Sequence, residues 1–222
     1  MTANDRATID YKSEVLRKTI HLVSLSIPTI YYFITKELAL SILIPLTVFS
    51  LLLDYGRYYH KPTAEFIYKI FGIIMRKHER DEKKKNLNGA TYVLISAVIV
   101  VLIFPKVFVV TAFAVLIIGD ISAALIGRKF GKTKFLFKSL EGTLAFFFFS
   151  CFVVLVSPKV EGKLTEYLIG FVAVAVGAIA ENVSGEWTDD NLMVPITICI
   201  TMWILYALFL PQLPLILSNV PN

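Results

Sequence analysis

Seven apolar stretches run through this 222-residue chain and constrain its fold more than any other feature. They cover residues 21–34, 38–53, 89–104, 107–127, 143–157, 164–180 and 191–210. A helix needs about 20 apolar residues to cross the hydrocarbon layer of a bilayer, and polar side chains at its ends extend a shorter stretch. Hydrophobic residues make up 56% of the chain and charged residues only 18%, an apolar excess that a soluble domain of this size cannot bury. The sequence therefore predicts an all-α polytopic membrane protein of about seven transmembrane helices in one domain, 1–222, and excludes a soluble enzyme.

The distribution of Lys and Arg predicts how the helices are oriented. Four segments, 1–20, 54–88, 128–142 and 181–190, fall on one side of the membrane and together carry 18 of the 22 Lys and Arg residues. Positive loops stay in the cytosol, so we expect a cytosolic N-terminus. Fourteen of the 17 acidic residues lie on or near the same side. Any active site is therefore expected at the cytosolic face, in a cell membrane or an endoplasmic reticulum membrane.

The basic segment between the second and third stretches contains a second kind of helix. Within 61–80, helical spacing puts Phe66, Ile70, Ile73 and Ile74 on one face. An apolar stripe on a basic helix is typical of a helix lying at the membrane surface. We expect an interfacial amphipathic helix here.

One acidic residue, Asp120, lies inside an apolar stretch. An ionised group at this depth costs on the order of 2.5–3.5 kcal/mol on insertion scales, so it is paired, metal-bound or in a wet cavity. The alternative is a protonated or hydrogen-bonded structural Asp. Small residues at Gly119, Ala123 and Gly127 permit close helix packing, and the sixth stretch has a similar stripe that ends near Glu181. We expect Asp120 and Glu181 to meet in one inner pocket.

The inner loop 128–142 has the composition of a phosphate site. It carries Arg128, Lys129, Lys132, Lys134, Lys138, Ser139, Glu141 and Gly142. Cations beside a helix N-terminus bind anions, which predicts a bound polyphosphate. Residues 127–133 approach a Walker P-loop, but the glycines are one residue too close and no β-strand precedes them. We therefore exclude the Walker motif and keep the phosphate hypothesis.

The last inner loop, 181–190, is acidic instead. Its acids are Glu181, Glu186, Asp189 and Asp190, and Asn191 follows. Magnesium prefers such oxygen ligands together with substrate phosphates. An acidic loop and a basic loop on the same face predict a magnesium–nucleotide site.

The start of the first stretch adds two more candidates, Arg17 and His21. Arg17 is suited to clamp a phosphate, and His21 to orient a phosphate or carry a proton. Lys18 is explained by the positive-inside rule alone. For Arg17 and His21, a purely topological role remains the alternative.

An ordered set of short motifs resembles the CTP-dependent lipid kinase family, which includes dolichol kinase, phytol kinase and CTP-dependent diacylglycerol kinase and is distantly related to phosphatidate cytidylyltransferase. The set runs over 14–195 and consists of Arg17-Lys18 with His21, residues 88–92 (NGATY), Gly119-Asp120 with Ala123, Gly127 and Gly131, residues 138–142 (KSLEG), and Asp190-Asn191 with Pro195. The resemblance implies transfer of a phosphoryl group from CTP to the hydroxyl of a membrane lipid alcohol, a polyprenol or dolichol as the first choice. The cytidylyltransferase signature near the C-terminus is missing, which favours the kinase.

The residues and the resemblance together assign roles. Catalytic candidates are Asp120, Lys138, Glu141 and Glu181; nucleotide-binding candidates are Arg128, Lys132, Lys134, Lys138, Ser139, Gly142 and Asn191; substrate or phosphate candidates are Arg17, His21, Asn88 and Thr91; and metal candidates are Asp120 and Asp190. Expected partners are Mg²⁺ or another divalent cation, CTP, the lipid alcohol and the bilayer, and not nucleic acid. The choice between metal ligand and base among the acids stays open.

Three alternatives remain. In the first, the protein is a lipid kinase whose substrate is phytol, geranylgeraniol or diacylglycerol. In the second, it is a cytidylyltransferase that forms a CDP-lipid. In the third, it is a transporter that uses Asp120 and Glu181 to carry protons or cations. A transporter is expected to have charges at the midplane of the membrane, whereas here they gather at one face.

Overall fold

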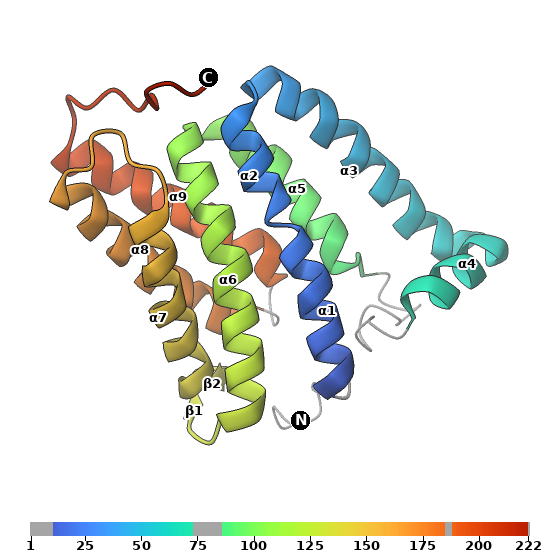
Figure 1. Cartoon of the computed structure of the whole chain (residues 1–222). Helices are drawn as coiled ribbons and strands as arrows, with labels where there is room; N and C mark the ends of the chain where they lie inside the picture. Colours follow the sequence, from blue (N-terminus) through green and yellow to red (C-terminus); the bar gives the residue numbers. More distant parts are fainter. Residues whose placement is uncertain (1–10, 73–85, 185–187, 222) are drawn as a thin grey trace.

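The structure of the chain, a computed structural model, describes residues 11–72, 86–184 and 188–221, and most of these lie in helices (Figure 1). In chain order the elements are α1 (Tyr11–Val23), α2 (Ser26–Phe33), α3 (Lys36–Tyr59), α4 (Lys61–Phe71), α5 (Gly89–Ile103), α6 (Lys106–Phe130), β1 (Lys134–Phe135), β2 (Lys138–Ser139), α7 (Leu140–Val156), α8 (Leu164–Val183) and α9 (Asp190–Phe209). The two strands form a short antiparallel hairpin between α6 and α7.

Length and composition suit these helices to a bilayer. Among the described residues, α3, α6, α8 and α9 are long and apolar enough to cross a membrane, and α5 and α7 are shorter apolar helices. Large apolar side chains also face outward, with Phe49 60%, Phe148 58% and Leu208 67% exposed. Rows of exposed apolar side chains would make a soluble protein aggregate, and lipid tails cover them in a membrane. The prediction of an all-helical membrane-associated protein is confirmed at this level.

The first apolar stretch, 21–34, is divided between two helices, α1 and α2. The backbone N–H groups of Ser24 and Leu25 bond to carbonyl groups three residues earlier, which ends α1 in a tight turn before α2 begins. Pro28 has no N–H to continue the α-helical ladder across this turn. Pro45, by contrast, lies inside the unbroken helix α3.

A helix, α4, is present between the second and third stretches, where an interfacial helix was expected. Pro62 occupies its first turn, where the missing N–H costs nothing. Phe66 is 59% exposed and Ile67 is buried. The predicted continuation to residue 80, with Ile73 and Ile74, lies outside the described residues, as does the side chain of Ile70.

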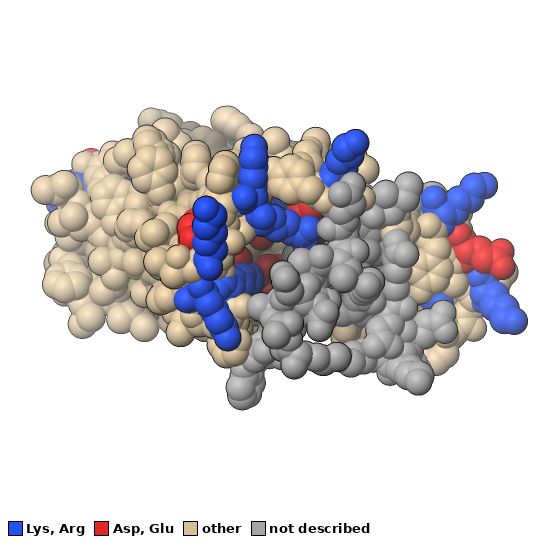
Figure 2. All heavy atoms as spheres, turned by 90° about the horizontal axis from the view of Figure 1, so that it is seen from below, with Lys and Arg blue, Asp and Glu red and all other residues tan. Residues whose placement is uncertain are grey.

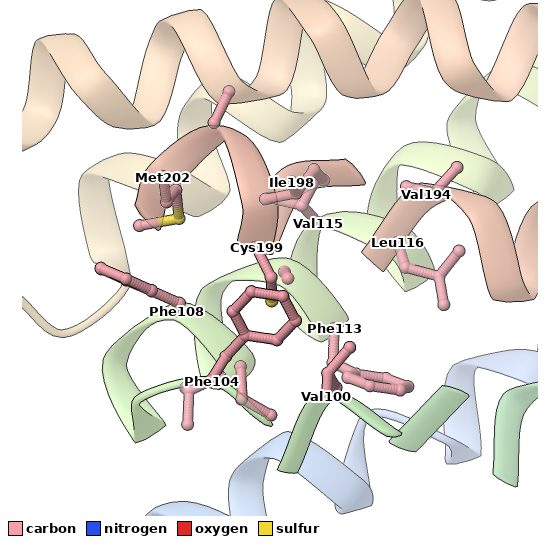
Figure 3. Packing of buried hydrophobic residues seen from close by; sticks show 14 of the residues in the cluster. Val100, Phe104, Phe108, Phe113, Val115, Leu116, Val194, Ile198, Cys199 and Met202 are labelled. Atoms are coloured by element: carbon pink, nitrogen blue, oxygen red, sulfur yellow. The ribbon is translucent and has the colours of Figure 1, made fainter. Parts of the chain in front are cut away.

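The core is built around α6. This helix packs against α1, α2, α7 and α9. Figure 3 shows Phe108 and Phe113 of α6 in the same buried cluster as Ile198, Cys199 and Met202 of α9. All five are at most 1% exposed, so α6 and the side chains on it are held rigidly in the middle of the molecule.

The small residues of α6 and of α8 were expected to pack these two helices against each other, but each set contacts a different helix. A Cβ atom added to Gly119 would lie 2.7 Å from the ring of Phe146, and one added to Gly127 would lie 3.3 Å from the Cα of Gly142. The α6 stripe therefore faces α7. Gly177 of α8 faces an isoleucine of α9, 2.9 Å from the position of an added Cβ. The close contacts join α6 to α7 and α8 to α9, rather than α6 to α8.

Several helix termini meet at one end of the bundle, which we call the charged end. It consists of α1, the C-terminal part of α6, the β1–β2 hairpin, the start of α7, the end of α8 and the start of α9 (Figure 1). Seen from this end, Figure 2 shows Lys and Arg side chains gathered around visible carboxylates. The predicted site residues on these elements lie here.

Candidate functional site: a buried carboxylate cluster

Asp120 is the centre of the charged cluster. It lies on the buried face of α6 and is 4% exposed. The ammonium group of Lys18, on α1, contacts its carboxylate, and the imidazole Nε2 of His21 lies 3.4 Å from the same oxygen. The side chain therefore points into the protein, toward the basic end of α1. An intramembrane acid facing lipid is excluded at this position.

Lys18 was not among the predicted site residues, because the positive-inside rule accounts for a lysine at a helix start. The structure places it differently. Its side chain is 2% exposed and joins α1 to α6. A lysine needed only for topology would extend into water. The signal available in the sequence was its spacing, because Lys18 and His21 are three residues apart and share one helical face.

Two further acids meet Asp120 from other helices. Oxygen atoms of Asp120, Glu181 and Asp190 all lie within 4.8 Å of one another, and all three residues are buried. Asp120 and Glu181 therefore lie close together, as the sequence led us to expect. Asp190 opens α9, where a negative charge is favoured by the helix dipole, but Glu181 is near the C-terminus of α8, where it is disfavoured. The position of Glu181 therefore needs a cation close by.

Lys138 supplies that cation. Its Nζ donates a hydrogen bond of 2.6 Å to Glu181 Oε1 and lies 3.6 Å from Asp190 Oδ2. Its side chain is 34% exposed, so the cluster is reachable from solvent through this residue. Desolvation lowers the pKa of Lys138, but the carboxylates of Glu181 and Asp190 outweigh this effect and raise the pKa above its ordinary value. Lys138 is cationic at physiological pH.

The β1–β2 hairpin carries Lys138 into place, and Asn182 fastens the hairpin. Asn182 Oδ1 accepts hydrogen bonds from the backbone N–H groups of Phe137 and Lys138, at 3.0 and 3.3 Å, while Nδ2 donates to Thr143 at 2.6 Å. Asn182 is fully buried. Sequence reasoning missed it. An amide beside Glu181 at the end of an apolar helix was the available signal.

Ser139, Gly142 and Glu141 build the entry to α7. The Ser139 hydroxyl accepts a hydrogen bond from the Gly142 N–H and caps the helix. A Cβ atom on Gly142 would lie 3.1 Å from the carbonyl oxygen of Ala123, so the glycine lets α7 approach α6. The Glu141 carboxylate accepts the backbone N–H of Thr133 at 3.0 Å. These contacts hold the hairpin, and Glu141 is not part of the carboxylate cluster.

Four further predicted residues lie outside the cluster. Lys132, just before β1, and Lys134, the first residue of β1, are exposed. Asn88 and Thr91, expected at the substrate phosphate, instead contact the fully buried Asp54: the Asn88 amide lies 2.8 Å from Oδ1 and the Thr91 hydroxyl 2.6 Å from Oδ2. This second polar cluster ties α3 to α5.

The donor set of the cluster fits a divalent cation. The cluster contains three carboxylates and two ammonium groups, those of Lys18 and Lys138. Its net charge is therefore negative when His21 is neutral. Oxygen ligands of this kind suit Mg²⁺ or Mn²⁺. Within the described chain, Asn191 Oδ1 is a buried atom without a hydrogen-bond partner, directly after Asp190. Such an atom is normally satisfied by a ligand, ion or water.

Comparison with known proteins adds one relative. The chain is 27% identical over 196 residues to an uncharacterized protein of Rickettsia prowazekii (strain Madrid E), covering 87% of this chain and 95% of that protein. No family model matches the chain, and no solved structure matches it. The match therefore spans nearly the whole length of both proteins.

Proposed function

We propose that this protein is a CTP-dependent kinase that phosphorylates the hydroxyl of a membrane lipid alcohol, a polyprenol or dolichol as the first choice. The observation that carries the proposal is the buried cluster of Asp120, Glu181 and Asp190 around Lys138. Acids and bases from four separate elements converge at one end of an apolar bundle. In the proposed reaction, CTP from the aqueous phase and the hydroxyl of the lipid at the membrane surface both reach this end of the bundle.

The topology proposed with this function has seven spans and a cytosolic N-terminus. In this arrangement α1 with α2 forms the first span, and α5 and α7 cross the bilayer although they are short. The charged end then faces the cytosol, in agreement with the distribution of Lys and Arg. The lipid alcohol approaches from the bilayer, so its chain stays among the acyl chains while its hydroxyl reaches the cluster.

The metal is a divalent cation held by Asp120 and Asp190, with Asn191 as a further ligand. When bound, the cation neutralises charge on the phosphate oxygens, as in other phosphoryl-transfer sites. Glu181 remains paired with Lys138.

In the proposed reaction the oxygen of the lipid hydroxyl bonds to the γ-phosphorus of CTP. The bond from that phosphorus to the bridging oxygen breaks, CDP leaves, and the hydroxyl proton passes to a carboxylate, Asp120 or Glu181. Lys138, at the edge of the cluster, stabilises the charge on the transferred group. Arg128 and Lys132 hold the rest of the triphosphate.

The experiment is a panel assay with purified protein in detergent. Labelled CTP, ATP and GTP are each offered with dolichol, phytol, geranylgeraniol and diacylglycerol, with Mg²⁺ present. We expect a lipid monophosphate from CTP and one class of alcohol, and no product from Asp120→Asn. Glu161→Gln is the matched control, because Glu161 is an exposed acid paired with Lys163 at the other end of the molecule. An active Asp120→Asn protein would overturn the proposal.

A further inference from the structure

Asn191 follows Asp190 in the first turn of α9 and is 5% exposed. The proposed metal site uses the oxygen of its side-chain amide. An amide carries this oxygen at one end and two N–H donors at the other end, on groups of nearly the same size. Only the oxygen end binds a cation. The orientation of the amide therefore determines whether Asn191 is a ligand.

Asp189 fixes the orientation of this amide. Its Oδ1 accepts a hydrogen bond from Asn191 Nδ2 at 2.7 Å and a second one from the Asn191 backbone N–H at 3.0 Å. Because the NH₂ end is held by Asp189, the oxygen is the end that points away from this acid. Among the described residues, Asn191 Oδ1 is a buried acceptor without a hydrogen-bond partner. The protein holds the amide by its donors and leaves the acceptor for a ligand.

The Asn191 side chain lies on the interior face of α9. Helical spacing puts it on the same face as Val194 and Ile198, which are both 0% exposed. Figure 3 shows these two residues in one buried cluster with Leu116 of α6. At the charged end α6 ends and α9 begins (Figure 1), and the two helices pack together. Asp120, one turn after Leu116, and Asn191, one turn before Val194, are therefore both displaced toward the charged end.

The surroundings of this oxygen favour a cation as its ligand. The two arginines predicted at the site, Arg17 and Arg128, contact Glu14, an acid outside the carboxylate cluster, at 2.7 and 3.0 Å. The carboxylates of the cluster itself repel an anion. A divalent cation shared by these carboxylates and the amide oxygen of Asn191 is the ligand that such a donor set favours.

Capping of α9 accounts for only one of the two bonds to Asp189. A helix cap accepts a backbone N–H, and serine does this about as well as aspartate. The bond from the Asn191 side chain adds nothing to the cap. Hydrogen bonds that orient a metal ligand are important for binding, and losing one lowers metal affinity by about 10- to 100-fold.

We propose that Asp189 is a positioning residue that holds the Asn191 amide so that its oxygen, and not its NH₂ group, faces a divalent cation at the carboxylate cluster. The assignment of this cation to phosphoryl transfer rests on the proposed function. Binding of the metal does not require transfer, so the positioning role is tested by itself.

The test measures the affinity of the purified protein for Mn²⁺, with free Mn²⁺ followed by electron paramagnetic resonance. Asp189→Asn keeps an oxygen that accepts both hydrogen bonds, and should bind Mn²⁺ within threefold of the wild type. Asp189→Ser keeps the helix cap but is too short to hold Nδ2, and should bind at least tenfold more weakly. Glu161→Gln is the matched control and should bind as the wild type does.

A double variant shows whether Asp189 acts through Asn191. Asn191→Leu removes the amide and should weaken Mn²⁺ binding at least tenfold. Adding Asp189→Ser to Asn191→Leu should cause no further loss, because no amide is left to orient. Without metal, Asp189→Ser should melt within about 3 °C of the wild type, because its cap is intact. If Asn191→Leu does not fold, the comparison of Asp189→Asn with Asp189→Ser decides.

The positioning role is overturned in any of three cases. Asp189→Ser binds Mn²⁺ as tightly as the wild type. Asp189→Asn and Asp189→Ser lose equal affinity, which would mean that the charge of Asp189 matters and the orientation does not. The losses of the two single variants add in the double variant. A wild type that binds no Mn²⁺, with or without CTP, would overturn the metal assignment as well.

Turnover separates this role from the proposed function. If the wild type is a kinase, Asp189→Ser should need at least tenfold more Mg²⁺ for half of its maximal rate, with kcat within threefold of the wild type at saturating Mg²⁺. A purely structural Asp189 would lower the amount of folded enzyme and leave the Mg²⁺ dependence unchanged, which would overturn the positioning role alone. A wild type that binds Mn²⁺ through Asn191 but transfers no phosphate from CTP would overturn the kinase and keep the positioning role.

Discussion

Because Asp120 pairs with Lys18, removing one charge of the pair or both charges separates the contribution of Asp120 to stability from its contribution to activity. Asp120→Asn removes one partner of a buried ion pair and leaves the Lys18 ammonium, at 2% exposure, without its carboxylate. Breaking a buried pair in this way costs roughly 3–5 kcal/mol. For a chain of this size, each kcal/mol corresponds to about 2–4 °C in melting temperature. The single variant should therefore melt about 6–20 °C below the wild type.

Adding Lys18→Met to Asp120→Asn removes the other charge as well. Replacing a buried pair with uncharged side chains of similar volume is often neutral, so the double variant should recover most of the lost melting temperature. Its lipid kinase activity should stay absent, because the carboxylate is still missing. The assay is thermal unfolding in detergent, followed by intrinsic fluorescence, with activity measured on the same samples.

Three results would refute this reasoning. If Asp120→Asn melts at the wild-type temperature, the pair is not buried as described. If the double variant is as unstable as the single one, Lys18 is not the main partner of Asp120. A stable double variant that retains activity would show that Asp120 has no catalytic role.

Three further predictions concern Glu166 at the opposite end of the molecule and two residues at the charged end, Asn182 and Lys138. Glu166, fully buried at the opposite end, accepts three backbone N–H groups and the Tyr206 hydroxyl; Glu166→Gln should lower the unfolding free energy by about 2–3 kcal/mol, measured by chemical denaturation, with the KM for CTP unchanged. Asn182→Ala should lower kcat at least tenfold with a smaller loss of stability, because Lys138 loses its support; a wild-type kcat would contradict the role of Asn182. The raised pKa of Lys138 means that its stabilisation is complete below the ordinary value of 10.5 and is lost as the pH rises through the folded-state value. The difference in melting temperature between wild type and Lys138→Met should therefore be constant from about pH 7 to 9, and a difference that shrinks in that range would be inconsistent with this pairing.

The sequence predicted the class of fold and the meeting of Asp120 with Glu181, for a simple physical reason. Apolar length determines which segments cross a membrane, and an acid inside such a segment must face a partner. Both inferences need only local composition. That the Asp120 side chain faces the interior of the protein was therefore predictable without knowledge of helix packing.

Other features depend on tertiary contacts that composition does not encode. From the sequence alone, the positive-inside rule explains Lys18, and only the packing of α1 on α6 shows that it pairs with Asp120. Asn182 acts through the backbone of a hairpin that is 44 and 45 residues away in sequence. Asn88 and Thr91 were assigned through the resemblance, and their contacts are with Asp54. Each of these roles is set by which helices are neighbours.

The position of the label in CTP tests the central claim most directly. Purified wild-type protein is incubated with polyprenol and Mg²⁺, once with CTP labelled at the γ-phosphate and once with CTP labelled at the α-phosphate, and the lipid fraction is counted. The account predicts γ-label in the lipid, none from Asp120→Asn, and no α-label. Label from the α-phosphate in a lipid product, or no label from either nucleotide with any lipid alcohol, would contradict it.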